Sequence, residues 1–181
     1  MSSQNPWKTL SSRRIYENPW IRVREDQVLR PDGSPGIYGV VETKIATGVV
    51  ALTERQEVYL VGQYRYPTEH YSWEIIEGGA EPGEAPLSAI KRELGEEAGL
   101  EAQSWEQLGG EIHLSNCFSA EVAHLYLAKD LTVVPRSPDV TEILEVRCLP
   151  LTEALSMVGS GEIKDAMSII GLLRAAQALK I

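Results

Sequence analysis

Residues 78–100 read GGAEPGEAPLSAIKRELGEEAGL, and this stretch decides how the rest of the chain is interpreted. The pattern predicts a helix from Ala85 to Ala98, because Pro86 suits a first helical turn and Gly99 suits a C-terminal break. A glycine pair before the helix allows the backbone to pass close to a ligand. The apolar stripe that can pack on a core consists of Leu87, Ile90 and Leu94.

Three carboxylates, Glu93, Glu96 and Glu97, lie at helical spacing in this segment and share a face. Like charges at this spacing repel each other and destabilise a helix. A run of this kind is usually a solvated helix face, but here a glycine loop, a proline entry and an apolar stripe accompany it. Hard divalent cations take oxygen ligands, and Mg²⁺ is often held by carboxylates together with substrate phosphates. The stretch therefore predicts a metal site for a phosphate compound.

The same residues resemble the Nudix box, with every specified position matched. The resemblance implies a hydrolase that cuts a nucleoside diphosphate linked to another moiety, using Mg²⁺ or, alternatively, Mn²⁺. It implies that Glu93 and Glu97 are the principal metal ligands and that Glu96 is a further ligand or binds through water. In such enzymes the backbone carbonyl at the position of Glu77 often ligates a metal, so the carbonyl of Glu77 is expected to do so here.

Two further positions of the box have supporting roles by the same resemblance. Arg92 is expected to hold the glutamates in place through a charge-assisted pair. Glu84 is expected to tie down the glycine loop without taking part in the chemistry.

Composition limits the classes of partner. The chain has 181 residues, a formal net charge of -9 and a pI of about 4.9, which argue against a nucleic-acid partner. No apolar stretch is long enough to span a bilayer, and Met1 to Lys8 lacks a signal-peptide core. Two cysteines, Cys117 and Cys148, give neither a disulfide framework nor a four-cysteine zinc site. A cytoplasmic protein without membrane contact is expected.

Alternating and β-branched stretches predict an antiparallel sheet in residues 1–42, with strands at Trp7–Ile15, Trp20–Leu29 and Gly36–Glu42. Residues 43–181 are expected to form the Nudix hydrolase domain. Mixed strands and a few helices indicate an α+β fold, and the resemblance sharpens this to an α/β/α sandwich. Further expected elements are strands at Val49–Leu52, Glu57–Tyr64, Trp73–Ile76, Gly109–Leu114, Glu121–Leu127 and Leu144–Leu149, and helices at Thr152–Val158 and Asp165–Leu179.

Motifs outside the box resemble the ADP-ribose pyrophosphatase and nucleoside-diphosphate-sugar group of Nudix enzymes. They are QYRYP at 63–67, Trp73-Glu74 and GEIKDA at 161–166. The resemblance implies hydrolysis of ADP-ribose to AMP and ribose 5-phosphate. It also implies a homodimer that exchanges its N-terminal sheets and builds each site from both chains. Asn116 stands where proline is expected, and Glu77 where a small residue is common, so a broader sugar-nucleotide preference stays open.

Four residues are candidates for substrate binding. Arg65 suits a diphosphate, or it is a surface arginine packed on a tyrosine. Trp20, contributed by the partner chain, is expected to stack on the nucleobase, and the alternative is a core or dimer-interface tryptophan. Glu74 anchors the ligand or a loop, or forms a structural salt bridge. Glu121 is the fourth candidate.

The expected mechanism is attack of water on phosphorus, with metal ions neutralising charge on the diphosphate oxygens and a carboxylate taking the proton. In the resembling group the base lies on a loop late in the fold. That loop matches Asp139 to Glu145, and Glu142 is the preferred base, with Glu145 and Glu121 as runners-up. Glu96 and Glu97 complete the catalytic set.

Other functions are weighed against this one. Diadenosine polyphosphates and oxidised nucleotides are alternative substrates that fit the outer motifs less well. NADH is disfavoured because zinc-ribbon cysteines are missing, and coenzyme A because only Leu52-Thr53-Glu54-Arg55 of its signature is present. A non-catalytic Nudix-fold sensor of ADP-ribose or a sugar nucleotide is the alternative from another class, and the intact glutamate set argues against it.

Overall fold

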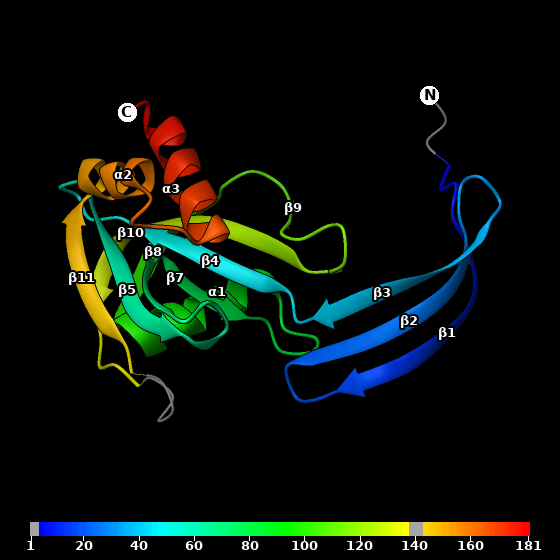
Figure 1. Cartoon of the computed structure of the whole chain (residues 1–181). Helices are drawn as coiled ribbons and strands as arrows, with labels where there is room; N and C mark the ends of the chain where they lie inside the picture. Colours follow the sequence, from blue (N-terminus) through cyan, green and yellow to red (C-terminus); the bar gives the residue numbers. More distant parts are fainter. Residues whose placement is uncertain (1–3, 138–142) are drawn as a thin grey trace. The chain divides into compact units, whose positions relative to one another are not determined.

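The computed structural model describes residues 4–137 and 143–181. Within these ranges, strands β1 to β3 come first, and eight further strands and three α-helices follow (Figure 1). The elements are β1 (Lys8–Glu17), β2 (Ile21–Leu29), β3 (Pro35–Thr43), β4 (Ala46–Ala51), β5 (Glu57–Arg65), β6 (His70–Glu74), β7 (Ile76–Gly79), α1 (Pro86–Glu93), β8 (Leu100–Gln107), β9 (Ile112–His113), β10 (Val122–Val133), β11 (Glu145–Pro150), α2 (Leu151–Ser160) and α3 (Ala166–Leu179).

The chain divides into two compact units. The first contains the residues up to Lys44 together with His113–Val122, and the second contains Ile45–Ile112 and Ala123–Ile181. Each unit has its own sheet structure, and each is described separately.

The first unit is an antiparallel sheet in the order β1-β2-β3, which confirms the three predicted N-terminal strands. The segment His113–Val122 adds to β3, because Val41 donates a backbone hydrogen bond to Phe118 (2.8 Å) and accepts one from Ala120 (2.9 Å). Every residue of β1 is exposed. This sheet therefore has only a small core of its own, with Val28 as its buried apolar residue among those described.

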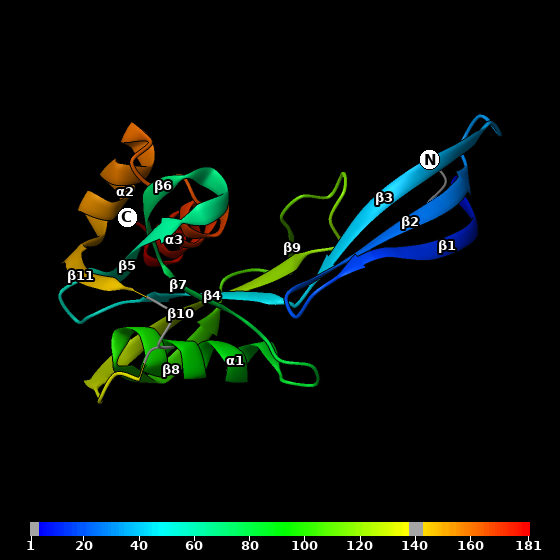
Figure 2. The same ribbon diagram turned by 60° about the horizontal axis from the view of Figure 1, so that its bottom comes forward.

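The second unit contains two sheets with a shared interior. One has the order β7-β4-β10-β8, with β4 and β10 parallel, and the other has the order β11-β5-β6. Helix α1 lies against one face of the first sheet, where Ile90 and Leu94 pack with Val49 and Ile76. Helix α3 lies against the other face, as Figure 2 also shows, since a Cβ on Gly48 would meet Met167 of α3. The predicted sandwich of a mixed sheet between helices is confirmed.

The structure differs from the predicted elements in four places. The strand predicted at Trp73–Ile76 is split, because Ile75 donates its backbone N–H to Ser168 Oγ (3.0 Å) where the chain crosses between the two sheets. The edge strand β8 was not predicted, because most of its residues are polar and exposed and give little alternation. Helix α2 runs from Leu151 to Ser160 and is capped by Gly161 (φ +76°), so it is longer than the predicted Thr152–Val158. The strand predicted at Gly109–Leu114 is reduced to the two residues of β9.

The two cysteines are free and exposed. Among the described residues, none of the helices combines the length and the apolar character that crossing a bilayer requires.

Candidate active site

The loop before α1 is held closed by Glu84. The carboxylate of Glu84 accepts a hydrogen bond from the backbone N–H of Glu81 (2.9 Å), and the Glu84 N–H donates to the Glu81 carbonyl (2.8 Å). Gly83 lies between them at φ +85°, where a side chain would be strained. Pro86 opens α1 as predicted. Glu84 therefore orders the loop, as the sequence indicated.

Arg92 gathers the carboxylates of the helix around one guanidinium. Its Nη1 donates to Glu93 (2.8 Å) and to Glu96 (2.9 Å), and its Nη2 donates to Glu84 (3.3 Å). Nη2 also reaches the carbonyl of Gly79 (3.4 Å). Hydrogen bonding to Glu84, together with the charges of the other glutamates, raises the pKa of Arg92 further above its ordinary value. The arginine thus fixes the positions of side chains that would otherwise repel one another.

Gly78 lets strand β7 approach Glu93 closely. A Cβ built on Gly78 would lie 2.2 Å from Cδ of Glu93, which no real side chain tolerates. Any residue other than glycine at position 78 would therefore displace the carboxylate of Glu93. The glycine is required by the site and not by a turn.

The segment Leu94–Ala98, which carries Glu96 and Glu97, is wound as a π-helix and ends at Gly99 (φ +67°). Single-turn π segments inside helices occur frequently at functional sites. Glu97 is only 5% exposed, and its Oε2 atom is buried without a hydrogen bond in the described part of the chain, although the residue does interact with its neighbours. The predicted helix from Ala85 to Ala98 is confirmed in position, with a change of winding at its end.

The donor set fits a hard divalent cation. Three carboxylates, from Glu84, Glu93 and Glu96, pair with Arg92, and the carboxylate of Glu97 belongs to the same helical segment. Oxygen donors with an excess of negative charge are what Mg²⁺ and Mn²⁺ select. Within residues 4–137 and 143–181, no three acidic, histidine or cysteine side chains already converge as a metal cage. Glu93 and Glu96 face Arg92 instead, so their side chains would have to turn toward a bound ion.

Glu77 points its side chain away from this cluster. Ser168 Oγ in α3 donates a hydrogen bond to Glu77 Oε1 (3.0 Å). Burial, with a further contribution from the nearby carboxyl of Asp165, raises the pKa of Glu77 well above its ordinary value of 4.5. Successive side chains of a strand point to opposite faces, so Glu77 faces α3 while Gly78 faces Glu93. Only the backbone of Glu77 is left for the cluster, which is the role the resemblance assigned to it.

Arg65 and Glu74 form an ion pair. Nε of Arg65 lies 3.0 Å from both carboxylate oxygens of Glu74, and Gln63 donates to the same carboxylate (3.4 Å). Glu74 is 2% exposed, whereas the Arg65 side chain is 40% exposed. The salt bridge that the sequence left open for Glu74 is present. The Arg65 side chain remains accessible to a ligand.

The remaining candidates lie apart in the chain. Trp20, in the first unit, is 72% exposed in a turn that Asn18 holds by accepting the N–H groups of Trp20 (2.9 Å) and Ile21 (2.8 Å), so it is not a core tryptophan. Glu121, also in the first unit, is half-buried beside Ser119. Glu142 lies outside the described residues.

Glu145 begins β11 and accepts a hydrogen bond from the hydroxyl of Tyr71 (3.1 Å). It pairs with Gly62, and its side chain therefore points to the face opposite Val61. Val61 packs in the core under α1. The side chain of Glu145 is thus directed away from the α1 face of its sheet.

Sequence reasoning missed one polar residue that orders this region. Ser168 is fully buried and links Ile75, Glu77 and Asp165, because its N–H donates to Asp165 Oδ2 (2.7 Å). The sequence predicted only that a helix begins at Asp165, a residue type that suits an N-cap. A serine in an apolar helix gives no linear signal of contacts with residues more than 90 positions away.

The sequence matches two family descriptions over most of its length. Residues 7–41 match the nucleoside diphosphate sugar hydrolase N-terminal domain, and residues 42–167 match the NUDIX domain. The second match contains the loop, the arginine and the carboxylates described above.

Relatives and a solved structure agree with this match. The chain is 32% identical to the methanol dehydrogenase activator of Bacillus methanolicus over 96% of this chain and 95% of that one. It is 31% identical to the ADP-ribose pyrophosphatase of Bacillus subtilis (strain 168), with the same shares covered. A crystal structure of an ADP compounds hydrolase superimposes with a TM-score of 0.86 at 20% identity, covering 99% of this chain and 97% of that one. This chain therefore belongs to the Nudix family of hydrolases.

Proposed function

We propose that this protein hydrolyses the diphosphate linkage of nucleoside diphosphate sugars, with ADP-ribose as its main substrate and AMP and ribose 5-phosphate as the products. The observation that carries the proposal is the group of three glutamates around Arg92, with Glu97 in the same helical segment, in a Nudix chain. The name of the pyrophosphatase relative supports ADP-ribose. A broader range of sugar nucleotides remains part of the proposal, because Asn116 and Glu77 depart from the pattern of the ADP-ribose group.

The carboxylate cluster supports a dependence on a divalent cation, Mg²⁺ or Mn²⁺. Glu93 and Glu97 would hold the ion, Glu96 would contribute directly or through water, and the carbonyl of Glu77 would complete the set. Such an ion supplies neutralisation of the diphosphate oxygens and a lowered pKa for a bound water. Arg92 keeps the glutamates in register, and Gly78 leaves the space that Glu93 needs. Glu142 is the proposed general base, with Glu145 and Glu121 as alternatives.

The N-terminal sheet supports a homodimer. Strand β1 is exposed along its whole length, and the first unit exposes several large apolar side chains: Trp7, Leu10, Ile15, Tyr16, Trp20 and Ile37. A single layer of three strands cannot bury its apolar side chains by itself. We propose that a second copy of the chain covers this sheet, and that Trp20 of one copy then meets the nucleobase bound by the other. The proposed location is the cytoplasm, which suits two free cysteines.

The second candidate function is that of a nucleotide sensor that controls a partner protein without hydrolysis. The name of the activator relative suggests it, and that relative is about as similar to this chain as the pyrophosphatase is. A protein that only bound a nucleotide to control a partner would not need Arg92 to gather three carboxylates at 2.8–3.3 Å. The charge excess at this site favours hydrolysis.

The decisive experiment is a substrate panel with Mg²⁺ or Mn²⁺, read by chromatography of the products. The panel contains ADP-ribose, sugar nucleotides with other bases, a diadenosine polyphosphate and an oxidised nucleotide. Release of AMP from ADP-ribose that stops with a chelator supports the proposal. Tight binding of ADP-ribose without turnover of any compound would establish the sensor instead. Light scattering of the same sample should give the mass of a dimer, and a monomer would remove the shared site.

A further inference from the structure

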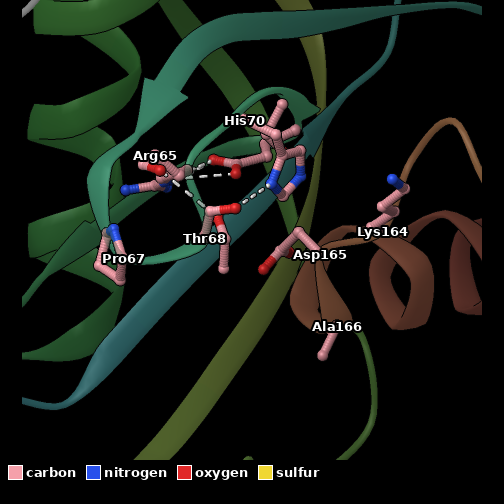
Figure 3. A pocket seen from close by; sticks show the side chains of 9 residues that line it. Arg65, Pro67, Thr68, His70, Lys164, Asp165 and Ala166 are labelled. Atoms are coloured by element: carbon pink, nitrogen blue, oxygen red, sulfur yellow. Dashed lines mark hydrogen bonds and ion pairs between the residues drawn. The ribbon is translucent and has the colours of Figure 1, made fainter.

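A cavity of about 490 Å³ opens between the β5–β6 hairpin and the start of α3, within the second unit (Figure 3). Arg65, Thr68 and His70 line it from the hairpin side, and Asp165 and Lys164 face them from the segment that opens α3. Its volume lies in the range of small-molecule sites. The cavity is separate from the Arg92 cluster, since the described residues that line it include neither Arg92 nor the glutamates of its segment.

Ser72 is the first sign that this cavity is built for a ligand. The residue is 3% exposed and lines the cavity, yet its hydroxyl has no hydrogen-bond partner among the described residues. Among the described residues, the buried side-chain oxygens without a partner do not include Ser72 Oγ, so this hydroxyl reaches the space of the cavity. A ligand in the cavity can therefore donate a hydrogen bond to Ser72 or accept one from it.

The cavity offers hydrogen-bond donors and acceptors together. Lys164 is exposed at its rim and forms no ion pair with a described residue. The Nε and Nη2 atoms of Arg65 are used by Glu74, which leaves Nη1 available. Asp165 and Glu74 bring carboxylate oxygens to the same walls. A ligand must therefore both donate and accept hydrogen bonds here.

This mixture selects one class of ligand. A bare phosphate carries one to two negative charges, and it would be repelled by the carboxylates of Glu74 and Asp165. A nucleobase would gain from stacking on a large aromatic side chain, but the aromatic side chain among the described residues that line the cavity is the small imidazole of His70, without tryptophan, tyrosine or phenylalanine. Sugar hydroxyls donate and accept equally well and need no aromatic surface.

The position of the cavity suits the sugar half of the proposed substrate. Glu74 lines the cavity, and Gly78 touches Glu93 on the far side of β7. Four residues separate them, so they are at most about 13–14 Å apart along an extended chain. A nucleotide sugar consists of two ring systems joined by two phosphates, and it can bridge this separation.

We propose that this cavity binds the hydroxyls of the sugar that is released as a sugar phosphate, with Ser72, Lys164 and Asp165 as its specificity-determining residues. The inference rests on the proposed function and adds the site that distinguishes one sugar from another. Arg65 stands at its entrance, between the sugar and the diphosphate, and Glu74 holds the guanidinium in place.

The test compares ADP-ribose with the β-methyl ester of ADP, which has the same diphosphate ester linkage but no sugar at its distal end. Ser72→Ala and Lys164→Met should each lower kcat/KM for ADP-ribose about tenfold, the effect of one hydrogen bond, mainly through KM. The loss with the methyl ester should be at least about fivefold smaller. Equal losses with the two substrates, or no loss with either, would overturn the inference.

Matched controls remove the same groups elsewhere. Ser156→Ala in α2 and Lys129→Met in β10 make the same changes at positions outside the lining of the cavity. They should not alter the ratio of the two kcat/KM values. Melting temperatures establish that Ser72→Ala is folded, which matters because Ser72 is buried. Lys164 is exposed, so Lys164→Met tests the effect on kcat/KM without a risk to folding.

A binding measurement separates failure of this inference from failure of the proposed function. If the wild-type protein cleaves neither substrate, calorimetric titration with ribose 5-phosphate and with inorganic phosphate still decides. Ribose 5-phosphate should bind at least about tenfold more weakly to Ser72→Ala than to the wild type, with inorganic phosphate changed less. Equal binding of ribose 5-phosphate to both proteins would refute the sugar site whatever the catalytic result.

Discussion

Ion pairs between arginines and carboxylates occur in both units, but the ratio of arginines to carboxylates differs between the two sets. In the first unit, four arginines pair with four carboxylates across β1, β2 and β3; they are Arg13, Arg14, Arg22 and Arg24 with Glu17, Glu25, Asp26 and Glu42. In the second unit, Arg92 pairs with Glu84, Glu93 and Glu96, and Glu97 follows directly in the chain. A balanced set joins strands, whereas an unbalanced set leaves negative charge that a cation can neutralise.

The difference between the two sets indicates which charged side chains support the fold and which support the function. The pairs of the N-terminal sheet lie mainly at the surface, where an ion pair contributes little to stability. The carboxylates around Arg92 oppose folding by mutual repulsion, so their presence needs a gain outside folding. The predictions below change one charge at a time in each set.

The largest effect is expected for Glu97→Gln. The substitution keeps the shape of the side chain and removes a charge from the unbalanced set. We expect kcat for ADP-ribose to fall at least about a hundredfold, since even residues behind metal ligands contribute 10–100-fold. Thermal melting should stay close to that of the wild type. Glu101→Gln, an exposed residue in β8, is the matched control, and activity near the wild-type level for Glu97→Gln would refute its role as a ligand.

Arg92→Met should have the next largest effect, because it leaves Glu84, Glu93 and Glu96 without their shared partner. We expect a loss of about 10–100-fold in kcat and a requirement for more Mg²⁺. Arg92→Lys keeps the charge but loses the planar guanidinium fork, so it should recover only part of the activity. Full activity in Arg92→Met would show that the carboxylates are positioned without it.

Asp26→Asn tests the buried member of the balanced set. Asp26 is 6% exposed, accepts a hydrogen bond from Ser12 (2.6 Å) and pairs with Arg24 (3.1 Å). The hydrogen bond from Ser12, with help from Arg24, lowers the pKa of Asp26 below its ordinary value of 3.8. Its ionised form therefore stabilises the fold above pH 3.8, and this stabilisation is lost as the pH falls through the lowered pKa.

The variant should lower the free energy of unfolding by about 1–3 kcal/mol at neutral pH. Urea denaturation at several pH values should show the difference from the wild type shrinking below pH 3.8. A difference that stays constant down to acid pH would show that Asp26 acts by packing and not by its charge.

Arg13→Ala should have the smallest effect. Arg13 donates to Glu25 at 2.8 and 3.1 Å, but its side chain is 71% exposed. An exposed pair contributes about 0–1 kcal/mol, and added salt should abolish the difference from the wild type. A loss above that range would mean that the pair is covered by another surface in solution, as in the proposed dimer.

The parts of the site that were predicted are local in sequence. Glu84, Arg92, Glu93 and Glu96 lie within thirteen positions, and helix geometry alone brings Arg92 beside Glu96. The break at Gly99 and the N-cap at Asp165 follow from local backbone chemistry and are also confirmed. The split at Ile75 was missed, because it depends on Ser168 of a helix more than 90 residues away.

The sequence by itself determined the family, the sandwich fold and the set of carboxylates, because each depends on residue types at fixed spacing along one helix and its loop. Only the tertiary structure decided that Arg65 pairs with Glu74, that the side chain of Glu77 faces α3, and that Ser72 lines a cavity without a partner. These facts depend on which strands become neighbours and which face each residue takes. Packing of the whole chain sets both, and no local pattern encodes them.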